Sequence, residues 1–280
     1  MSTIRHASFE SLNVDNNFDL EVNSRTDKYV HIKFIGEEFP LAQEEAWRIH
    51  AEGYRAMNFV TDEAIGEDGF LDLTIDKSRT IKGSEYYVVI NTDKEDDRAT
   101  LRIVPPKPFC DYTGLPSYES VESKLFPFGK NMLRNFYDSG YAINEISALA
   151  KTENASPLAI FELFREVIQD AQTRKEVWFF SIVNNTFQTI VKRMGESNFV
   201  VIGEDVGIDD PRVNPNIQLR PTIFVPYLFY QNLMEDIDST TDKLSKKRLI
   251  FNLMFFSEGL KDNDLSAQIS SFLKKVEDNR

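Results

Sequence analysis

The stretch VWFFSIV, residues 177–183, constrains the fold of this chain more than any other, because it carries no charge over the full length of a strand. An unbroken apolar run of this length is typical of a strand covered on both faces. The segment before it has apolar residues at helical spacing, with Ser156 as a cap and Pro157 at the first helical position. A helix followed by a buried strand predicts a sheet with helices packed on it.

Periodicity predicts the remaining elements. The predicted strands are 28–36, 85–91, 99–105, the stretch around Glu145, 177–183, 199–203 and 220–226; the predicted helices are 40–57, 127–140, 157–175, 186–195, 227–237 and two more in the C-terminal part. We therefore expect an α/β (α+β) fold. It should have a flexible polar arm over residues 1–26, a main domain over residues 27–238 and a C-terminal helical pair over residues 239–280.

Composition argues against several classes of protein. The net charge of -13 is opposite to that of a nucleic-acid-binding protein. Cys110 is the only cysteine, so no disulfide forms within the chain, which fits a reducing cytoplasm. The three histidines, His6, His31 and His50, lack metal-ligand spacing, and the N-terminal residues contain no long apolar run. We expect a cytoplasmic protein without a metal site, secretory signal or membrane span.

Glu145 is the first candidate for a chemical role. It lies in the predicted strand between Ile143 and Ile146. Apolar surroundings partly desolvate a carboxylate and make it a better proton acceptor. The alternative is a solvent-exposed glutamate on an edge strand.

Arg102 is the second candidate, because it stands in the predicted strand between Leu101 and Ile103. An arginine cannot lose its charge, so among apolar neighbours it needs an acidic partner. The acidic loop before the hairpin offers Asp72 or Asp76. The pair would either shape a substrate pocket or form a structural salt bridge.

These residues, in this order of elements, resemble the autoinducer synthase branch of the Gcn5-related N-acetyltransferase (GNAT) superfamily. That branch includes acyl-homoserine lactone synthases and N-acyl amino acid synthases. The resemblance covers about residues 28–235 and rests on RIHAEGY with Tyr54, DGFLDLTIDKS with Asp72 and Asp76, TLRIVPP with Arg102, NEIS with Glu145 and Ser147, and the segment 177–204.

The resemblance implies a mixed, mostly antiparallel twisted sheet flanked by helices, with the C-terminal helices as an extension. It implies an acyltransferase that moves a fatty acyl group to the amine of an amino acid-like acceptor. The catalytic residues would be Glu145, Ser147 and Arg102, and the substrate-binding residues would be Tyr54, Asp72, Asp76, Trp178 and Phe180. The two aromatic residues of the strand would line an acyl slot; the alternative is that they pack the sheet.

The acyl donor is inferred from an absence. No glycine occurs between Gly140 and Gly195, so the glycine-bearing turn that binds the coenzyme A pyrophosphate in related acetyltransferases is missing. A phosphopantetheine arm carries a single phosphate and so needs fewer backbone N–H donors from this turn. Acyl-carrier protein is therefore the expected co-substrate and partner. Leu149, Lys151 and Ser156 would bind this donor. Free acyl-CoA is the alternative, and no permanently bound cofactor is expected.

An acidic carrier protein needs a basic docking patch on this acidic chain. The candidates are Lys192, Arg193, Arg174 and Lys175. A further basic cluster over residues 246–248 is interpreted as a solvated helix face.

Two alternative functions stay open. One is an acyl-homoserine lactone synthase that uses S-adenosylmethionine. Against it, Ala148 occupies the position where those enzymes have an arginine, and His50 falls where they have another if Tyr54 is aligned. The second is a non-catalytic GNAT-like module that binds acyl chains or proteins.

Overall fold

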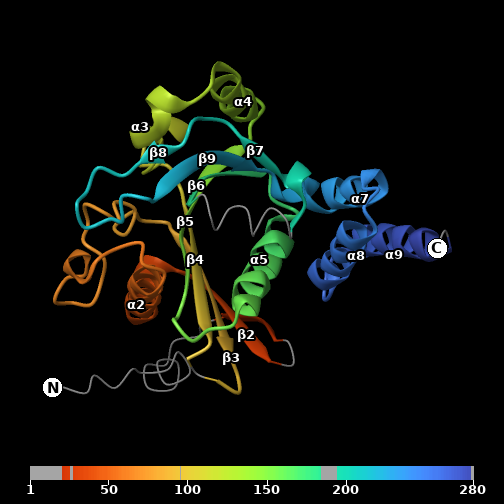
Figure 1. Ribbon diagram of the computed structural model, residues 1–280, viewed down its shortest axis with the longest axis horizontal. Helices are drawn as coiled ribbons and strands as arrows, with labels where there is room; N and C mark the ends of the chain where they lie inside the picture. The colour runs from red at the N-terminus through yellow and green to blue at the C-terminus, as the bar shows by residue number, and fades with distance from the viewer. Residues whose placement is uncertain (1–20, 26–27, 95, 184–193, 279–280) are drawn as a thin grey trace. The chain divides into compact units, whose positions relative to one another are not determined.

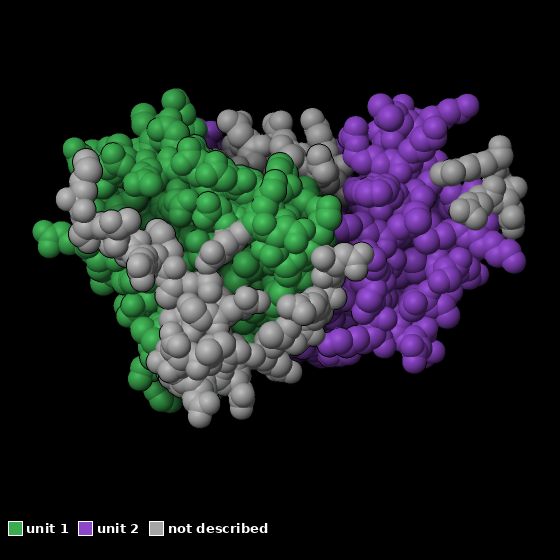
Figure 2. All heavy atoms as spheres, turned by 90° about the horizontal axis from the view of Figure 1, so that it is seen from below, with its two compact units in different colours: residues 1–116, 145–166, 208–217 green, residues 117–144, 167–207, 218–280 purple. Residues whose placement is uncertain are grey.

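The computed structural model describes residues 21–25, 28–94, 96–183 and 194–278. Two compact units divide the chain (Figure 2). Unit 1 comprises residues 1–116, 145–166 and 208–217, and unit 2 comprises residues 117–144, 167–207 and 218–280. The division falls inside one strand and one helix, so neither unit is a continuous stretch of sequence.

Unit 1 is built on an antiparallel sheet in the order β1-β2-β3-β4-β5 (Figure 1). Its strands are β1 (Glu21–Arg25), β2 (Tyr29–Ile35), β3 (Glu85–Asn91), β4 (Arg98–Val104) and most of β5 (Ala142–Lys151). Its helices are α2 (Pro40–Ala56) and the first part of α5 (Pro157–Ala171). The predicted strands and helices of this part of the sequence are confirmed. Strand β1 is an addition, since its residues were expected to belong to the arm.

Pairing aligns a row of four side chains across this sheet. Phe34 pairs with Tyr86, Tyr86 with Arg102, and Arg102 with Ser147. Residues paired directly opposite one another point to the same face of a sheet. Helix α2 covers this face, because its buried Ile49 belongs to one apolar cluster with Phe34 and Tyr86. The row therefore places a charged guanidinium beneath a helix.

Gly53 allows α2 to approach β5 closely. A Cβ atom at this position would lie 2.5 Å from the carbonyl oxygen of Lys151 and 2.9 Å from the Cβ of Ala150. Any larger residue would push the helix away from the sheet. The close approach brings the polar side chains at the end of α2 near those of β5.

A β-bulge interrupts β5 immediately after Ser147. Thr100 of β4 pairs with Ala150, and Arg102 pairs with Ser147, so β5 has one residue more than β4 over this interval. Ala148 adopts the left-handed conformation, with φ of 53°, which L-residues other than glycine rarely adopt. Bulges of this kind re-aim side chains and take one residue out of the hydrogen-bond ladder.

The other face of the sheet carries a buried charge cluster. Nδ1 of His31 in β2 lies 2.8 Å from Glu166, and its Nε2 lies 3.2 Å from Glu162. Arg165 forms an ion pair with Glu162. Burial alone would lower the pKa of His31, but the two carboxylates outweigh it and raise the pKa. His31 thus joins α5 to β2 through two carboxylates.

Unit 2 contains a second antiparallel arrangement, in which β9 pairs with β6, β7 and β8. Its strands are β6 (Glu176–Val183), β7 (Phe199–Val201), β8 (Val206–Gly207) and β9 (Gln218–Phe224); its helices are α3 (Tyr118–Val121), α4 (Pro127–Asp138), α7 (Phe229–Ser239), α8 (Lys243–Ser257) and α9 (Asn263–Asp278). The apolar run 177–183 is a strand as predicted, and Trp178 is fully buried in it. The two predicted C-terminal helices are confirmed as α8 and α9.

Local signals at helix ends are confirmed where the structure describes them. The Ser156 hydroxyl accepts a hydrogen bond from the Leu158 N–H, and Pro157 begins α5. Gly140 has φ of 76° just beyond the end of α4. The predicted helix 186–195 falls almost entirely outside the described residues, as do Lys192 and Arg193. None of the described helices is long and apolar enough to cross a membrane.

The bulge predicts a difference between two neighbouring alanines. Ala148→Gly relieves a left-handed conformation, whereas Ala150→Gly, in regular strand geometry, relieves nothing. Both residues are buried, so the lost methyl contact and the added chain entropy are similar. We expect Ala148→Gly to be more stable than Ala150→Gly by about 1–2 kcal/mol in urea unfolding. Equal stabilities would show that Ala148 is not strained.

Candidate active site

Arg102 is the centre of a buried polar cluster in unit 1. Its side chain is 0% exposed, and one guanidinium nitrogen lies 2.5 Å from a carboxylate oxygen of Asp76. The same nitrogen donates to the Ser78 hydroxyl and, at 3.2 Å, to the Ser147 hydroxyl. The Ser78 and Ser147 hydroxyls are 2.9 Å apart. The cluster thus joins the acidic loop to β4 and β5.

Asp76 also contacts His50, which lies on the last turns of α2. The second carboxylate oxygen is 3.4 Å from Nδ1 of the His50 ring. Burial opposes ionisation of Asp76, but the charge of Arg102 and the contact with His50 outweigh it and hold the pKa of Asp76 far below its usual value. Burial lowers the pKa of His50, and Asp76 only partly offsets this. His50 is therefore neutral at pH 7.

Glu145 lies beside this cluster and is 5% exposed, so it is not an edge residue in bulk water. It precedes Ser147 by two positions in β5 and is paired with Val104, which places it on the same face as Arg102. Burial raises the pKa of Tyr54, and the charges of Asp76 and Glu145 raise it further. The Tyr54 and His50 rings are in edge contact at 4.2 Å. Tyr54 thus contacts His50, and its pKa responds to the charge of Glu145.

Asp72 does not reach Arg102. Its carboxylate accepts hydrogen bonds from the Thr74 N–H and hydroxyl and pairs with Arg212 at 3.4 Å. Its side chain is 43% exposed, so it lies on the solvent side of the loop between α2 and β3. Of the two aspartates considered as partners, the structure selects Asp76. The role of Asp72 in substrate binding stays a prediction.

The residues expected on the donor side are close in sequence but mostly engaged by the chain itself. The Lys151 ammonium donates to the carbonyl oxygen of Ala155 at 2.8 Å. The Ser156 N–H donates to Asp97, so this end of α5 already carries a carboxylate. Leu149 is half-buried in the bulge. Their proposed contact with a donor phosphate stays a prediction.

Trp178 and Phe180 lie in the aromatic core of unit 2. The Trp178 ring stacks on Phe224 at 5.4 Å and donates from Nε1 to Glu176, and Phe180 is in edge contact with Phe199. These contacts are those of packing residues. Their role in an acyl slot stays a prediction.

Three members of the cluster were not selected from the sequence as site residues. They are His50, Ser78 and Tyr86, whose hydroxyl accepts hydrogen bonds from Trp47 at 2.8 Å and Arg102 at 3.4 Å. One signal was available, because His50 and Tyr54 are four residues apart on a predicted helix and so share a face.

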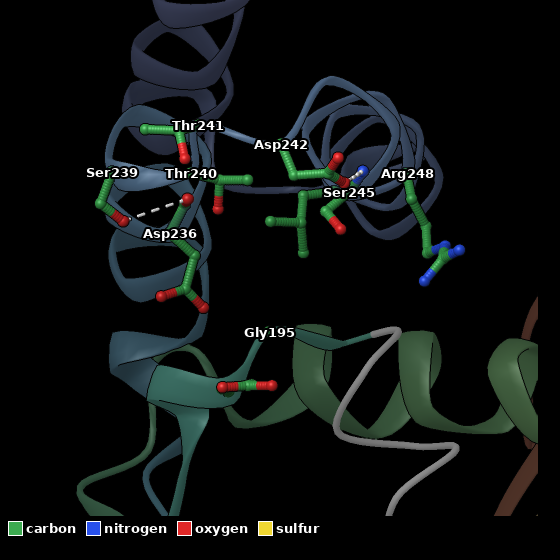
Figure 3. A pocket seen from close by; sticks show the side chains of 10 residues that line it. Gly195, Asp236, Ser239, Thr240, Thr241, Asp242, Ser245 and Arg248 are labelled. Carbon is green, nitrogen blue, oxygen red and sulfur yellow. Dashed lines mark hydrogen bonds between the residues drawn. The ribbon is translucent and has the colours of Figure 1, made fainter.

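Unit 2 has a polar cavity of about 450 Å³ at the junction of α7 and α8. Asp236 reaches toward it from α7 and Arg248 from α8 (Figure 3). The Asp236 carboxylate also accepts hydrogen bonds from the Ser197 hydroxyl and N–H. None of the residues chosen from the sequence lines this cavity. Among the described residues no group of His, Cys, Asp or Glu is arranged to hold a metal ion.

Comparison with solved structures establishes the fold. The chain is similar to FeeM, an N-acyl amino acid synthase from uncultured soil microbes, with a TM-score of 0.51, 19% identity, 74% of this chain covered and 96% of that chain. This likeness confirms the fold class and the GNAT-like, autoinducer synthase-like fold expected from the sequence. No protein-family model and no curated protein matches the sequence.

Two further solved structures are more distant. MesI, a CoA-dependent acyl-homoserine lactone synthase, has a TM-score of 0.45 at 10% identity, over 79% of this chain and 94% of that one. Apo FdhC, a nucleotide-linked sugar GNAT, has a TM-score of 0.36 at 12% identity, over 78% and 96%. At these scores the two likenesses support no conclusion about this chain.

The ion pair predicts unequal effects of the same substitution at two aspartates. Asp76→Asn leaves the fully buried Arg102 without a compensating charge, so we expect the free energy of unfolding to fall by about 3–5 kcal/mol. Asp72→Asn removes the same charge from an exposed loop and should leave stability close to that of the unaltered protein. Urea titrations followed by circular dichroism compare the two. A small effect at Asp76 would mean that Arg102 is not buried in solution.

The neutral His50 predicts a pH dependence of stability. Its folded-state pKa is lowered, so the unfolded chain binds a proton near pH 6.5 that the folded chain does not. Stability is therefore lost as pH falls through this range, by up to about 1.4 kcal/mol per pH unit for one proton. Between pH 7.5 and 5.5, the free energy of unfolding of His50→Gln should fall less steeply than that of the unaltered protein. Parallel slopes would contradict a buried neutral His50.

Proposed function

We propose that this chain is an N-acyltransferase that moves a fatty acyl group from a thioester to the amine of an amino acid-like acceptor. The observation that supports it best is the buried carboxylate of Glu145, which lies on the Arg102 face of the sheet and whose charge helps to raise the pKa of Tyr54. The fold, shared with an N-acyl amino acid synthase, agrees with this assignment.

The chemistry requires a proton acceptor. An amino acid enters as an ammonium ion, which cannot attack a carbonyl carbon until it loses a proton. Glu145 accepts this proton, directly or through one water molecule. The amine nitrogen then forms a bond to the thioester carbon, the carbon–sulfur bond breaks, and the second amine proton passes to the sulfur. The products are an amide, a thiol and one proton released to solvent.

The bulge supplies a place for the thioester carbonyl. Its extra residue leaves the hydrogen-bond ladder between β4 and β5, so a backbone N–H of Ala148 or Leu149 can donate to the developing oxyanion. The bulge begins next to Ser147 and three residues from Glu145. Proton acceptor and oxyanion donor thus lie on the same strand.

Arg102 acts by positioning in this scheme. Its guanidinium is engaged by Asp76, Ser78 and Ser147, so it holds the acidic loop and β5 in register on the acceptor side. Asp76 in turn contacts His50 of α2.

The donor is assigned as acyl-carrier protein, with acyl-CoA as the alternative. The segment between β5 and α5 has no glycine, and Asp97 already accepts the Ser156 N–H. An additional dense array of phosphates would meet a carboxylate here. A phosphopantetheine arm, with one phosphate, avoids most of this repulsion. Both donors belong to the cytoplasm, the location expected from the sequence.

A thioester assay tests the proposed function. Thiol release from acyl-carrier protein and from acyl-CoA is followed with a panel of amino acids, and the acylated product is identified by mass spectrometry. Glu145→Gln should lower kcat by about a hundredfold or more with one acceptor. Glu63→Gln, which removes an equal charge at an exposed position, should keep full activity.

Two outcomes would contradict the proposal. One is equal turnover by Glu145→Gln in a folded protein. The second is binding of acyl-carrier protein without turnover of any acceptor, which would favour the non-catalytic module.

A further inference from the structure

Helix α8 is apolar on two sides. One side belongs to the core of unit 2, where Leu253 and Phe256 are buried and the Phe256 ring is in edge contact with Phe229 of α7. The Tyr230 hydroxyl of α7 donates to the Phe256 carbonyl oxygen. These contacts account for the burial of one face only.

The opposite face of α8 combines basic and large apolar side chains. The exposed positions of α8 are Lys243, Leu244, Lys247, Arg248, Phe251 and Met254, which we call the α8 face; Arg248, at its edge, also lines the cavity at the junction with α7. Leu244 and Phe251 are each 67% exposed, and Met254 is 55% exposed. Their spacing of seven and three residues places them on one stripe, about 15 Å long at 1.5 Å per residue. No acidic residue interrupts the stripe.

This face is unlike the rest of the chain, whose net charge is -13. Exposed large apolar side chains that gather beside positive charges mark an interaction surface for an acidic partner. The sequence led us to interpret residues 246–248 as a solvated face. The structure changes that interpretation, because Lys247 and Arg248 flank exposed apolar side chains.

The surroundings of the α8 face favour a narrow partner. Exposed Asp238 and Asp242 lie before the stripe, and exposed Glu258 and Asp262 lie after it. A flat anionic membrane would bring its headgroups against these carboxylates as well. A single helix of a small protein can contact the stripe between them.

Two of the four basic residues expected to bind a carrier protein are engaged by neighbours in unit 2; the other two, Lys192 and Arg193, lie outside the described residues. Arg174 pairs with Asp170 at 2.9 Å and with Glu176 at 3.5 Å. The Lys175 ammonium donates to the Ser139 carbonyl oxygen and lies over the Tyr141 ring. The charge of Arg174 is partly neutralised by its two carboxylates, and Lys175 is held by a carbonyl oxygen and a ring, so among the described residues the α8 face is the better surface.

We propose that the α8 face docks an acidic acyl-carrier protein through a helix that presents carboxylates around apolar side chains. The proposal rests on the proposed function for the choice of partner. Lys247 and Arg248 would pair with the carboxylates, and Leu244, Phe251 and Met254 would bury the apolar side chains. The apolar contacts would slow dissociation of the complex, and the charges would speed its association.

Binding is measured by fluorescence anisotropy of a labelled holo-acyl-carrier protein titrated with the full chain. Two double variants test the face: Lys247→Glu with Arg248→Glu, and Leu244→Ser with Phe251→Ser. Each should raise Kd about tenfold or more. The matched control, Lys82→Glu with Lys94→Glu, changes net charge by the same amount at exposed positions of unit 1 and should leave Kd unchanged. Circular dichroism confirms that every variant is folded.

Salt provides an independent readout. Kd of the unaltered chain should rise between 50 and 300 mM salt, about the range over which surface charges become screened. The Lys247→Glu, Arg248→Glu variant should lose most of this dependence. The Leu244→Ser, Phe251→Ser variant should keep it, because its cations remain.

Three results would overturn the proposal: no binding of the carrier protein, binding that neither α8 variant weakens, or binding of the chain to phosphatidylglycerol vesicles that the α8 variants abolish while carrier binding is unchanged. Turnover of acyl-CoA or acyl-pantetheine, measured in the same variants, separates this proposal from the proposed function. Preserved turnover with these small donors, together with no carrier binding, would contradict the docking proposal and leave the proposed acyltransferase function standing.

Discussion

The burial of one positive charge at the centre of unit 1 governs the arrangement around it. Arg102 cannot lose its proton, so its buried charge needs a carboxylate partner. Asp76 is that partner. To reach Arg102, the loop from residue 66 to residue 84 folds back onto the sheet, where Ser78 contacts Ser147. Asp76 then has an oxygen left for His50 of α2. One ion pair thus connects a loop, two strands and a helix.

The bulge in β5 lies next to this cluster and interrupts the regular pairing of β4 and β5. Ser147 keeps its place opposite Arg102, and the chain then inserts one extra residue with a left-handed Ala148. Glu145 stays on the Arg102 face, while the backbone beyond Ser147 leaves the regular ladder. A carboxylate that accepts a proton and an N–H that stabilises an oxyanion are the two groups that amide formation from a thioester requires. In the proposed function, buried Glu145 and the bulge offer them on one strand.

The strands of this site could be predicted from the sequence, whereas several of its contacts depend on residues that are distant in the sequence. The strands of Arg102 and Glu145 follow from apolar runs, and the need of Arg102 for a partner follows from its charge. The choice of Asp76 over Asp72 could not be predicted from local sequence. It depends on Arg212, more than a hundred residues away in the sequence, which pairs with Asp72. His50 was missed because its role depends on Asp76. The bulge carries no sequence signal, since Ala148 is not a glycine. The exposure of Leu244 and Phe251 was hidden because an apolar residue on a helix predicts burial.

The proposed roles depend on a single claim, that the buried carboxylate of Glu145 serves chemistry on an amine. The most direct measurement is mass spectrometry of lipids extracted from cells that overproduce either the unaltered protein or Glu145→Gln at equal soluble levels. A new N-acylated amine that accumulates with the unaltered protein and is absent with the variant is the predicted result, and its mass would identify both substrates. The same new lipid in equal amount from both proteins, or no new lipid from either, would contradict the account.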